Sequence, residues 1–200
     1  MTALIVIVVL VVLVIGWIIM TYNRLVALRT QVANGWSQID VQLKRRYDLI
    51  PNLVESVKGY MGHEQDTRRQ VIEARNKAVA ANPGGNPGTA PATGATAATI
   101  AAETALTASL GKMFALAEAY PDLKANQSVQ QLMEELSSTE NKIGFARQFY
   151  NDTATSLNTA VQSFPGNLIA GKFGFQNAEL WRVAEAERAA VEVAPKVSLR

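Results

Sequence analysis

The cation run Lys44-Arg45-Arg46 is the group of residues in this sequence with the clearest chemical potential. Clustered ammonium and guanidinium groups bind phosphates, so the run raises the question of nucleotide or nucleic-acid binding. Nucleic-acid readers, however, usually show wider basic faces with stacking aromatics. Asp40 and Asp48 lie four residues on either side of Lys44, which is the spacing of salt bridges along one helix. The run therefore predicts a salt-bridged helix face, with docking between helices or subunits as the alternative.

A second stretch resembles a phosphate-binding loop. Residues 166–173 read GNLIAGKF and match the beginning of the pattern G-x-x-x-x-G-K. Such a loop needs Ser or Thr after the lysine to ligate magnesium, and Phe173 occupies that position. The loop also follows a strand, whereas here a helical pattern ends at Phe164-Pro165. We expect a packed turn at the end of a bundle, and no nucleotide.

Few residues in this sequence could bind a metal ion or act as a catalytic nucleophile. The chain has one histidine, His63, and no cysteine. A di-metal carboxylate site in a helical bundle needs two Glu-x-x-His pairs, which a single histidine cannot supply. The metalloprotease pattern H-E-x-x-H and the nucleophile pattern G-x-S-x-G are absent from the sequence. We expect no metal, no cofactor and no enzymatic activity.

Glu140 and Arg147 interrupt an otherwise apolar helical stripe that runs from Val129 to Phe164. A buried charge is costly unless it is paired, so we expect both side chains to find partners across the bundle. Structural pairing is a sounder interpretation than catalysis. Candidate contacts between helices or subunits are therefore Arg45, Arg46, Asp48, Glu140 and Arg147.

The elements that must position these residues begin with a membrane anchor. Residues 3–20 carry no charge and, as a helix, span about 27 Å, close to a hydrocarbon core of about 30 Å. A cleaved signal peptide would show a basic start and an A-x-A site, and the sequence has neither. We expect a single-pass anchor over residues 1–22. Arg24 and Arg29, just after the span, place the C-terminal part in the cytoplasm under the positive-inside rule.

Helical periodicity organises the rest of the chain. Apolar residues recur every three or four positions over 23–81, which predicts a long hairpin or a helix kinked near Ile50-Pro51. Residues 82–97 are rich in Gly and Pro and predict a flexible linker. Residues 98–164 predict two helices, and 165–200 an apolar turn, a short helix near 177–193 and a tail. The predicted fold is all-α, a single N-terminal transmembrane helix followed by an antiparallel bundle of about four helices.

Five segments together resemble the LemA family of bacterial membrane proteins. They are YNRLVALR (22–29), WSQIDVQLKRRYDLIPNLVESVKGY (36–60), TENKIGFARQFYND (139–152), FPGNLIAGKFGF (164–175) and the closing AEAERAAVEVAPKV. The Gly/Pro-rich linker does not match, and Gly35 replaces the alanine usual there. The resemblance implies one N-terminal anchor followed by a helical bundle, with no established enzymatic activity.

These observations favour a non-enzymatic, membrane-anchored scaffold in the cytoplasmic (inner) membrane that self-associates and presents its bundle to other envelope proteins. The alternative is a monomeric adaptor or regulator of a membrane protease, transporter or signalling protein. Its candidate docking surface is Leu168, Ile169, Phe173 and Phe175. Expected partners are the lipid bilayer, further copies of the chain and envelope proteins. With a net charge of +2, no global field favours nucleic acid, and we expect neither nucleic acid nor nucleotide.

Overall fold

A computed structural model describes residues 1–60, 64–82 and 96–182, and within these ranges every regular element is a helix. The all-α prediction is confirmed. The helices are α1 (Thr2–Val57), α2 (Gln65–Ala81), α3 (Ala97–Ala119), α4 (Pro121–Ala125), α5 (Gln127–Gln162) and α6 (Gly166–Phe173).

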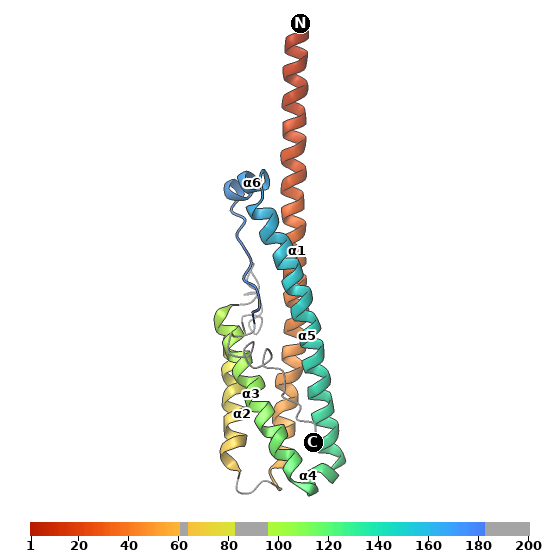
Figure 1. The fold of residues 1–200 in the computed structure, drawn as a ribbon, viewed down its shortest axis with the longest axis vertical. Helices are drawn as coiled ribbons and strands as arrows, with labels where there is room; N and C mark the ends of the chain where they lie inside the picture. The colour runs from red at the N-terminus through yellow and green to blue at the C-terminus, as the bar shows by residue number, and fades with distance from the viewer. Residues whose placement is uncertain (61–63, 83–95, 183–200) are drawn as a thin grey trace, which may run out of the picture.

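The anchor and the first bundle helix form one element, α1, which runs for 56 residues. At 1.5 Å per residue its length is about 84 Å. Its N-terminal part stands clear of the other helices (Figure 1), and the large apolar side chains from Leu4 to Ile15 are 50–69% exposed. In the described part of the chain, α1 alone contains a stretch long and apolar enough to cross a membrane. This apolar surface fits a membrane anchor.

Pro51 does not end α1, although the sequence predicts a joint at Ile50-Pro51. A proline inside a helix leaves the carbonyl four residues earlier without its usual N–H donor, and here that carbonyl belongs to Tyr47. Nε of Arg75, on α2, donates to the Tyr47 carbonyl oxygen at 3.3 Å. The neighbouring helix thus supplies the missing donor. The chain leaves α1 only after Val57 and enters α2 at Gln65.

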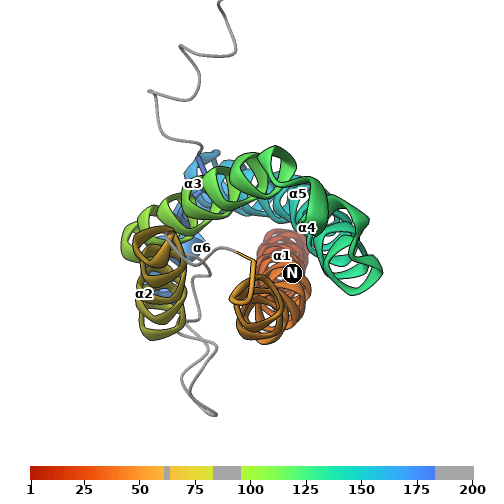
Figure 2. The ribbon, with the colours of Figure 1, turned by 90° about the horizontal axis from the view of Figure 1, so that it is seen from below.

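Helices α1, α2, α3 and α5 alternate in direction and form an antiparallel bundle, seen lengthwise in Figure 1 and end-on in Figure 2. The short helix α4 closes the end remote from the anchor, with Pro121 in its first turn. The prediction of about four bundle helices is confirmed. Buried apolar side chains recur every three or four residues along α1: Val32, Trp36, Ile39, Leu43, Tyr47, Ile50, Leu53 and Val57.

Gly35 lies where α1 and α5 approach each other closely. A Cβ at this position would be 3.1 Å from Cα of Tyr150 and 3.4 Å from Oγ1 of Thr153. A larger side chain would therefore push the two helix backbones apart. The Asn34-Gly35 step is part of the helix, and the glycine allows this contact.

The ends of the Gly/Pro-rich segment meet in the bundle. Residues 83–95 of the predicted linker lie outside the described ranges, but Asn82 and Thr99 are buried. Nδ2 of Asn82 donates to Oδ1 of Asp40 at 2.9 Å, and Oγ1 of Thr99 donates to the Ala81 carbonyl at 2.7 Å. The first bond holds the end of α2 to α1, and the second holds it to the start of α3.

The chain after α5 differs from the sequence prediction. Residues 166–173 form α6, which ends at Gly174 in the left-handed conformation with φ 72°. Residues 175–182 have no regular secondary structure and run along the bundle as an extended segment (Figure 1), which we call the strap. The helix predicted near 177–193 is therefore wrong for residues 177–182, and residues 183–200 lie outside the described ranges.

Candidate functional site

The three cations of the run enter three different environments. Nζ of Lys44 lies 2.8 Å from Oδ2 of Asp40 on the exposed face of α1. Arg45 reaches across to Glu135 of α5 at 3.7 Å, and both side chains are about half exposed. Arg46 is buried, with 1% of its side chain exposed. Because the third cation points into the core, the run does not form a phosphate-binding patch.

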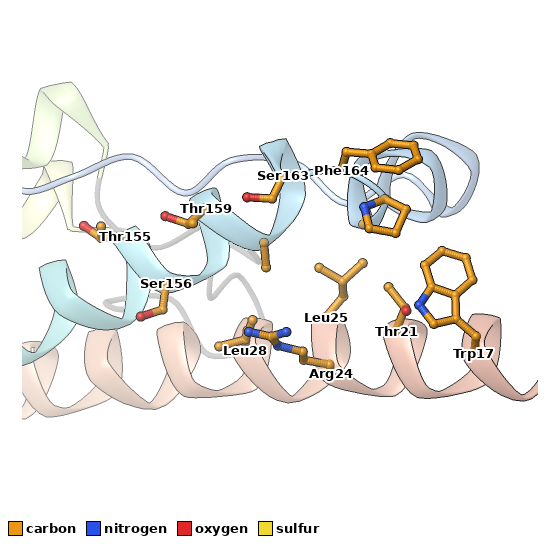
Figure 3. A pocket seen from close by; sticks show the side chains of 13 residues that line it. Trp17, Thr21, Arg24, Leu25, Leu28, Thr155, Ser156, Thr159, Ser163 and Phe164 are labelled. Carbon is orange, nitrogen blue, oxygen red and sulfur yellow. The ribbon is translucent and has the colours of Figure 1, made fainter.

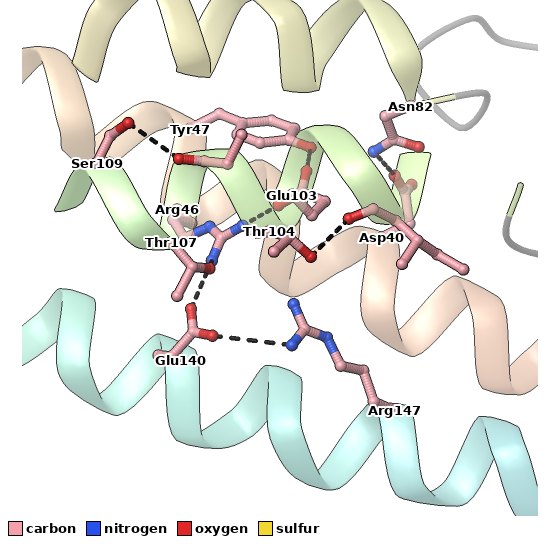
Figure 4. Close-up of polar contacts among 12 residues, drawn as sticks. Asp40, Arg46, Tyr47, Asn82, Glu103, Thr104, Thr107, Ser109, Glu140 and Arg147 are labelled. Carbon is pink, nitrogen blue, oxygen red and sulfur yellow. Dashed lines mark hydrogen bonds and ion pairs between the residues drawn. The ribbon is translucent and has the colours of Figure 1, made fainter. Parts of the chain in front are cut away.

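Arg46 joins three helices through its guanidinium (Figure 4). It forms ion pairs with Glu103 of α3 and with Glu140 of α5, the latter at 2.5 Å. Nη1 also donates to Oγ1 of Thr107 at 3.1 Å. Both terminal nitrogens of the guanidinium thus have partners, whereas its buried Nε has none among the described residues; a buried cation depends on such carboxylate partners to offset its desolvation. These contacts fix the position of α1 along the bundle axis relative to α3 and α5.

Tyr47 is a second hydrogen-bond donor to the Glu103 carboxylate. Its hydroxyl donates to the carboxylate oxygen Oε1, while Arg46 engages Oε2. Desolvation by burial raises the pKa of Tyr47 to about 12, although the charge of Arg46 acts in the opposite direction. The phenol therefore keeps its proton and remains a donor at neutral pH.

Arg147 connects the network to the strap. Its Nη1 lies 3.9 Å from Oε1 of Glu140, and its guanidinium sits over the Trp181 ring at 4.5 Å from the centroid. Trp181 in turn stacks on Trp36 of α1, with ring centroids 5.9 Å apart. The result is a cation–π contact inside the bundle. The buried network of Arg46, Arg147, Glu103 and Glu140 therefore has no net charge.

Two asparagines of α5 hold the strap in its extended conformation. Asn158 exchanges a pair of hydrogen bonds with the backbone of Ala178, at 2.7 and 2.9 Å. Asn151 does the same with the backbone of Trp181, at 2.8 and 2.9 Å. Seven helical residues rise about 10.5 Å and three extended residues about 10 Å, so the two spacings match. The asparagines thus replace the backbone partners that a strand would find in a sheet.

Three of the five predicted contact residues lie at contacts between helices, and Arg147 contacts the strap. Arg45, Arg46, Glu140 and Arg147 contact other elements of the same chain, whereas Asp48 is exposed. A contact between subunits stays a prediction for all five. Three cavities of about 570, 620 and 800 Å³ border the described helices, and their linings contain none of the network side chains.

Sequence reasoning missed Glu103, Trp181 and the two asparagines. Glu103 falls in phase with the buried positions Thr99, Leu106 and Leu110 of α3, so a helical count could have found it. The asparagine pair has only its spacing of seven residues as a signal. Within the described ranges no cluster of three or more potential metal ligands occurs, and His63 lies outside them.

The predicted docking surface is divided by the fold. Ile169 and Phe175 are buried with Leu25 at the level where α1 leaves the bundle. Leu168 and Phe173 remain 60% and 51% exposed. Only these last two residues are available to a partner, because the other two pack against the anchor helix.

A different apolar surface lies on the outer face of α1 and α5. Val41 of α1 is 58% exposed, and Phe145 and Phe149 of α5 are 75% and 43% exposed. They border the groove of about 570 Å³, which we call the outer groove. Its other lining residues are Ser37, Gln38, Gln42, Lys142 and Ala146.

Comparison with known proteins gives a family match over most of the chain. The model of the LemA family matches residues 35–194. Protein LemA of Metamycoplasma hominis is 26% identical over 170 residues, covering 85% of this chain and 73% of that protein.

Two further relatives carry the name of a magnetosome protein. Magnetosome protein MamQ 2 of Paramagnetospirillum magneticum is 28% identical over 182 residues, which covers 84% of this chain and 67% of the relative. Magnetosome protein MamQ of Magnetospirillum gryphiswaldense is 25% identical over 176 residues, covering 81% of this chain and 65% of the relative. The matched region includes the bundle and its buried network.

Proposed function

Because the chain belongs to the LemA family, we propose that it is a non-enzymatic, membrane-anchored helical scaffold that associates with further copies of itself. The single observation that supports this function is the outer groove, an apolar surface on the bundle with two exposed phenylalanines. Large aromatic side chains on an otherwise polar face are typical of protein interfaces.

Anchoring favours a second copy as the occupant of the groove. All copies in one membrane share one orientation, so their grooves stand at the same height above the bilayer. A two-fold axis along the membrane normal then brings Phe145 and Phe149 of one copy against the same residues of another. Confinement to the membrane plane also raises the effective concentration, so a modest interface suffices.

The oligomeric state of the full-length protein in mild detergent tests the scaffold. We expect a dimer or larger species for the natural chain and a monomer for Phe145→Lys, because a charge in the groove opposes its burial. Phe173→Lys is the matched control, since it places the same charge at an exposed phenylalanine outside the groove. A monomeric natural chain would contradict the proposal.

Cross-linking in the membrane gives a second readout. The chain has no cysteine, so Lys142→Cys introduces a unique thiol at the groove. We expect disulfide-linked pairs of this variant when isolated membranes are treated with an added oxidant that accepts the two electrons of the thiols. If cross-links to other proteins outnumber self-cross-links, the adaptor function is favoured, with Leu168 and Phe173 as its docking residues.

The proposed location is the cytoplasmic (inner) membrane, with the N-terminus outside and the bundle in the cytoplasm. Arg24 and Arg29 follow the apolar stretch and support this orientation. Ser137→Cys places a thiol on an exposed position of α5. We expect no labelling by an impermeant maleimide in intact cells, and labelling would place the bundle on the other side.

A further inference from the structure

The cavity of about 620 Å³ lies where α1 leaves the bundle, and we call it the junction pocket (Figure 3). One wall is α1 from Trp17 to Leu28, and the other is the C-terminal end of α5 with the turn into α6. It is separate from the outer groove and from the buried network, and the scaffold function does not require it.

The position of the junction pocket relative to the bilayer follows from the position of the anchor. Trp17 belongs to the last turns of the apolar stretch, and Arg24 is the first charged residue after it. Tryptophan and arginine at these positions mark the boundary between acyl chains and headgroups. If residues 3–20 cross the hydrocarbon core, the pocket opens at the level of lipid headgroups.

The aromatic and charged side chains of the lining form a gradient along the pocket, while the hydroxyls of Thr21 and Ser163 lie at its aromatic end and Leu28 at its charged end. Figure 3 shows Trp17 and Phe164 at the end nearer the N-terminus of α1, and Arg24 and Ser156 further toward the bundle. Phe164 is 79% exposed, and Pro165 lies beside it in the lining. A phospholipid has the same gradient, with acyl chains toward the bilayer centre and a polar group outside.

The polar part of the pocket suits an anion. Five hydroxyl side chains line the pocket as a whole, and they belong to Thr21, Thr155, Ser156, Thr159 and Ser163. Arg24 is its only charged lining residue. Among the described residues Arg24 forms no ion pair, in contrast to Arg45, Arg46, Arg69 and Arg147. The Ser156 hydroxyl donates to the Asp152 carbonyl at 2.9 Å, and a guanidinium together with the other four hydroxyls is well suited to phosphate oxygens.

We propose that the junction pocket binds the phosphate headgroup of an anionic phospholipid, with Arg24 on the phosphate and Trp17 and Phe164 beside the acyl chains. The site would tie α5 to the anchor helix through a lipid. It requires membrane anchoring but no particular oligomeric state, so its failure and the failure of the scaffold are distinguishable.

Tryptophan fluorescence of the full-length protein in lipid nanodiscs tests this site. Trp17 lines the pocket, whereas Trp36 and Trp181 are buried in the bundle and give a constant background. Brominated phosphatidylglycerol and brominated phosphatidylcholine, each at the same mole fraction in unlabelled phosphatidylcholine, compete for contact with Trp17. We expect the relative association constant to favour phosphatidylglycerol about fivefold, as one basic residue near a membrane surface provides.

Two variants separate a built site from general attraction to the surface. Arg24→Gln removes the cation, and we expect the preference for phosphatidylglycerol to fall to about one. Thr159→Phe fills the pocket without changing any charge, and it should also abolish the preference. Lys112→Gln is the matched control, because it removes an equal charge from an exposed position on α3 and should leave the preference unchanged.

Equal quenching by both brominated lipids in the natural chain would overturn the proposal. A preference that survives Thr159→Phe would also do so, because it would come from bilayer charge and not from the pocket. Glycerol phosphate added at the same concentration as the lipid distinguishes a soluble anion from a lipid. If it displaced the brominated lipid, the site would belong to a soluble phosphate and the lipid assignment would be wrong.

Discussion

Arg46 is stable in the core because two carboxylates and a hydroxyl meet its guanidinium there. Its neighbour Arg45 has a single partner at the surface. Burial raises the cost of losing a partner, since the remaining charge cannot turn to water. Two adjacent arginines in one helix therefore differ widely in their importance for stability.

Substitution of these arginines tests that difference. We expect Arg46→Met to lower the free energy of unfolding by about 3–5 kcal/mol, because Glu103 loses its cation in the core. Arg45→Met should change it by less than about 1 kcal/mol. Chemical denaturation of the full-length protein in mild detergent measures both. Equal effects of the two substitutions would contradict the buried position of Arg46.

The raised pKa of Tyr47 indicates that the folded protein loses stability at high pH. Its pKa is raised by burial to about 12, above the unfolded value of 10.0. The folded protein therefore holds this proton more tightly than the unfolded chain. The stability that this pKa difference contributes, on the order of 2 kcal/mol, is fully present below pH 10 and is lost as the pH rises through 12. We expect Tyr47→Phe to show a shallower decrease between pH 10 and 12, and identical slopes would refute the assignment.

At this scale the sequence predicted the paired charges but not the whole network. Arg46, Glu140 and Arg147 fall in phase with apolar stripes, and a charge in phase with a core needs a partner. Which carboxylate pairs with which arginine depends on the heights of three helices. The positions of the helices along the bundle axis are not set by local periodicity, so the pairing of Arg46 with Glu103 could not be predicted.

Among the elements, α1 shows how a neighbour compensates for a helix-breaking residue. Pro51 leaves the Tyr47 carbonyl without a backbone donor, and Arg75 of α2 provides one. The sequence indicates the proline clearly but not the compensation, because Arg75 is distant along the chain. The sequence leaves open a hairpin or a kinked helix near Ile50-Pro51, and the structure has one helix that continues past the proline.

A double-mutant cycle tests this compensation. Arg75→Met should cost about 1–2 kcal/mol in the natural chain, because the Tyr47 carbonyl loses its donor. In a Pro51→Ala background the backbone N–H returns, and the same substitution should cost clearly less. Thermal unfolding of the four proteins gives the coupling. A coupling of zero would show that Arg75 does not act through this carbonyl.

The strap is the element that the sequence misassigned. The sequence AELWR favours a helix, but residues 178–182 are extended because Asn151 and Asn158 of α5 bond their backbone and Trp181 stacks on Trp36. Asn158→Ala removes one pair of these hydrogen bonds and should increase cleavage at the strap by added protease. Asn141→Ala, on the exposed face of the same helix, is the control and should leave cleavage unchanged. Equal cleavage of both variants would argue against the asparagine contacts.

The molecule as a whole combines a membrane stretch and a bundle on one uninterrupted helix. Its tilt in the bilayer should therefore be shared by every bundle helix. Spin labels at Asn76→Cys on α2 and at Ser137→Cys on α5, in aligned bilayers, report this tilt. We expect both labels to rotate by the same angle when the hydrocarbon core is made thinner than the apolar stretch of about 27 Å, because an apolar helix longer than the core tilts to fit. Insertion of Gly-Ser-Gly after Tyr22 should remove the effect, and unequal rotations in the natural chain would contradict it.

Because α1 is unbroken, a tilt of its membrane-embedded part moves the far end of the bundle sideways. From Thr21 to Val57 the helix extends about 55 Å. A change in tilt of about 10° would carry the far end sideways by about 10 Å, two turns of a helix or the width of one. A small difference in bilayer thickness is thereby converted into a large displacement at the tip, where α4 lies.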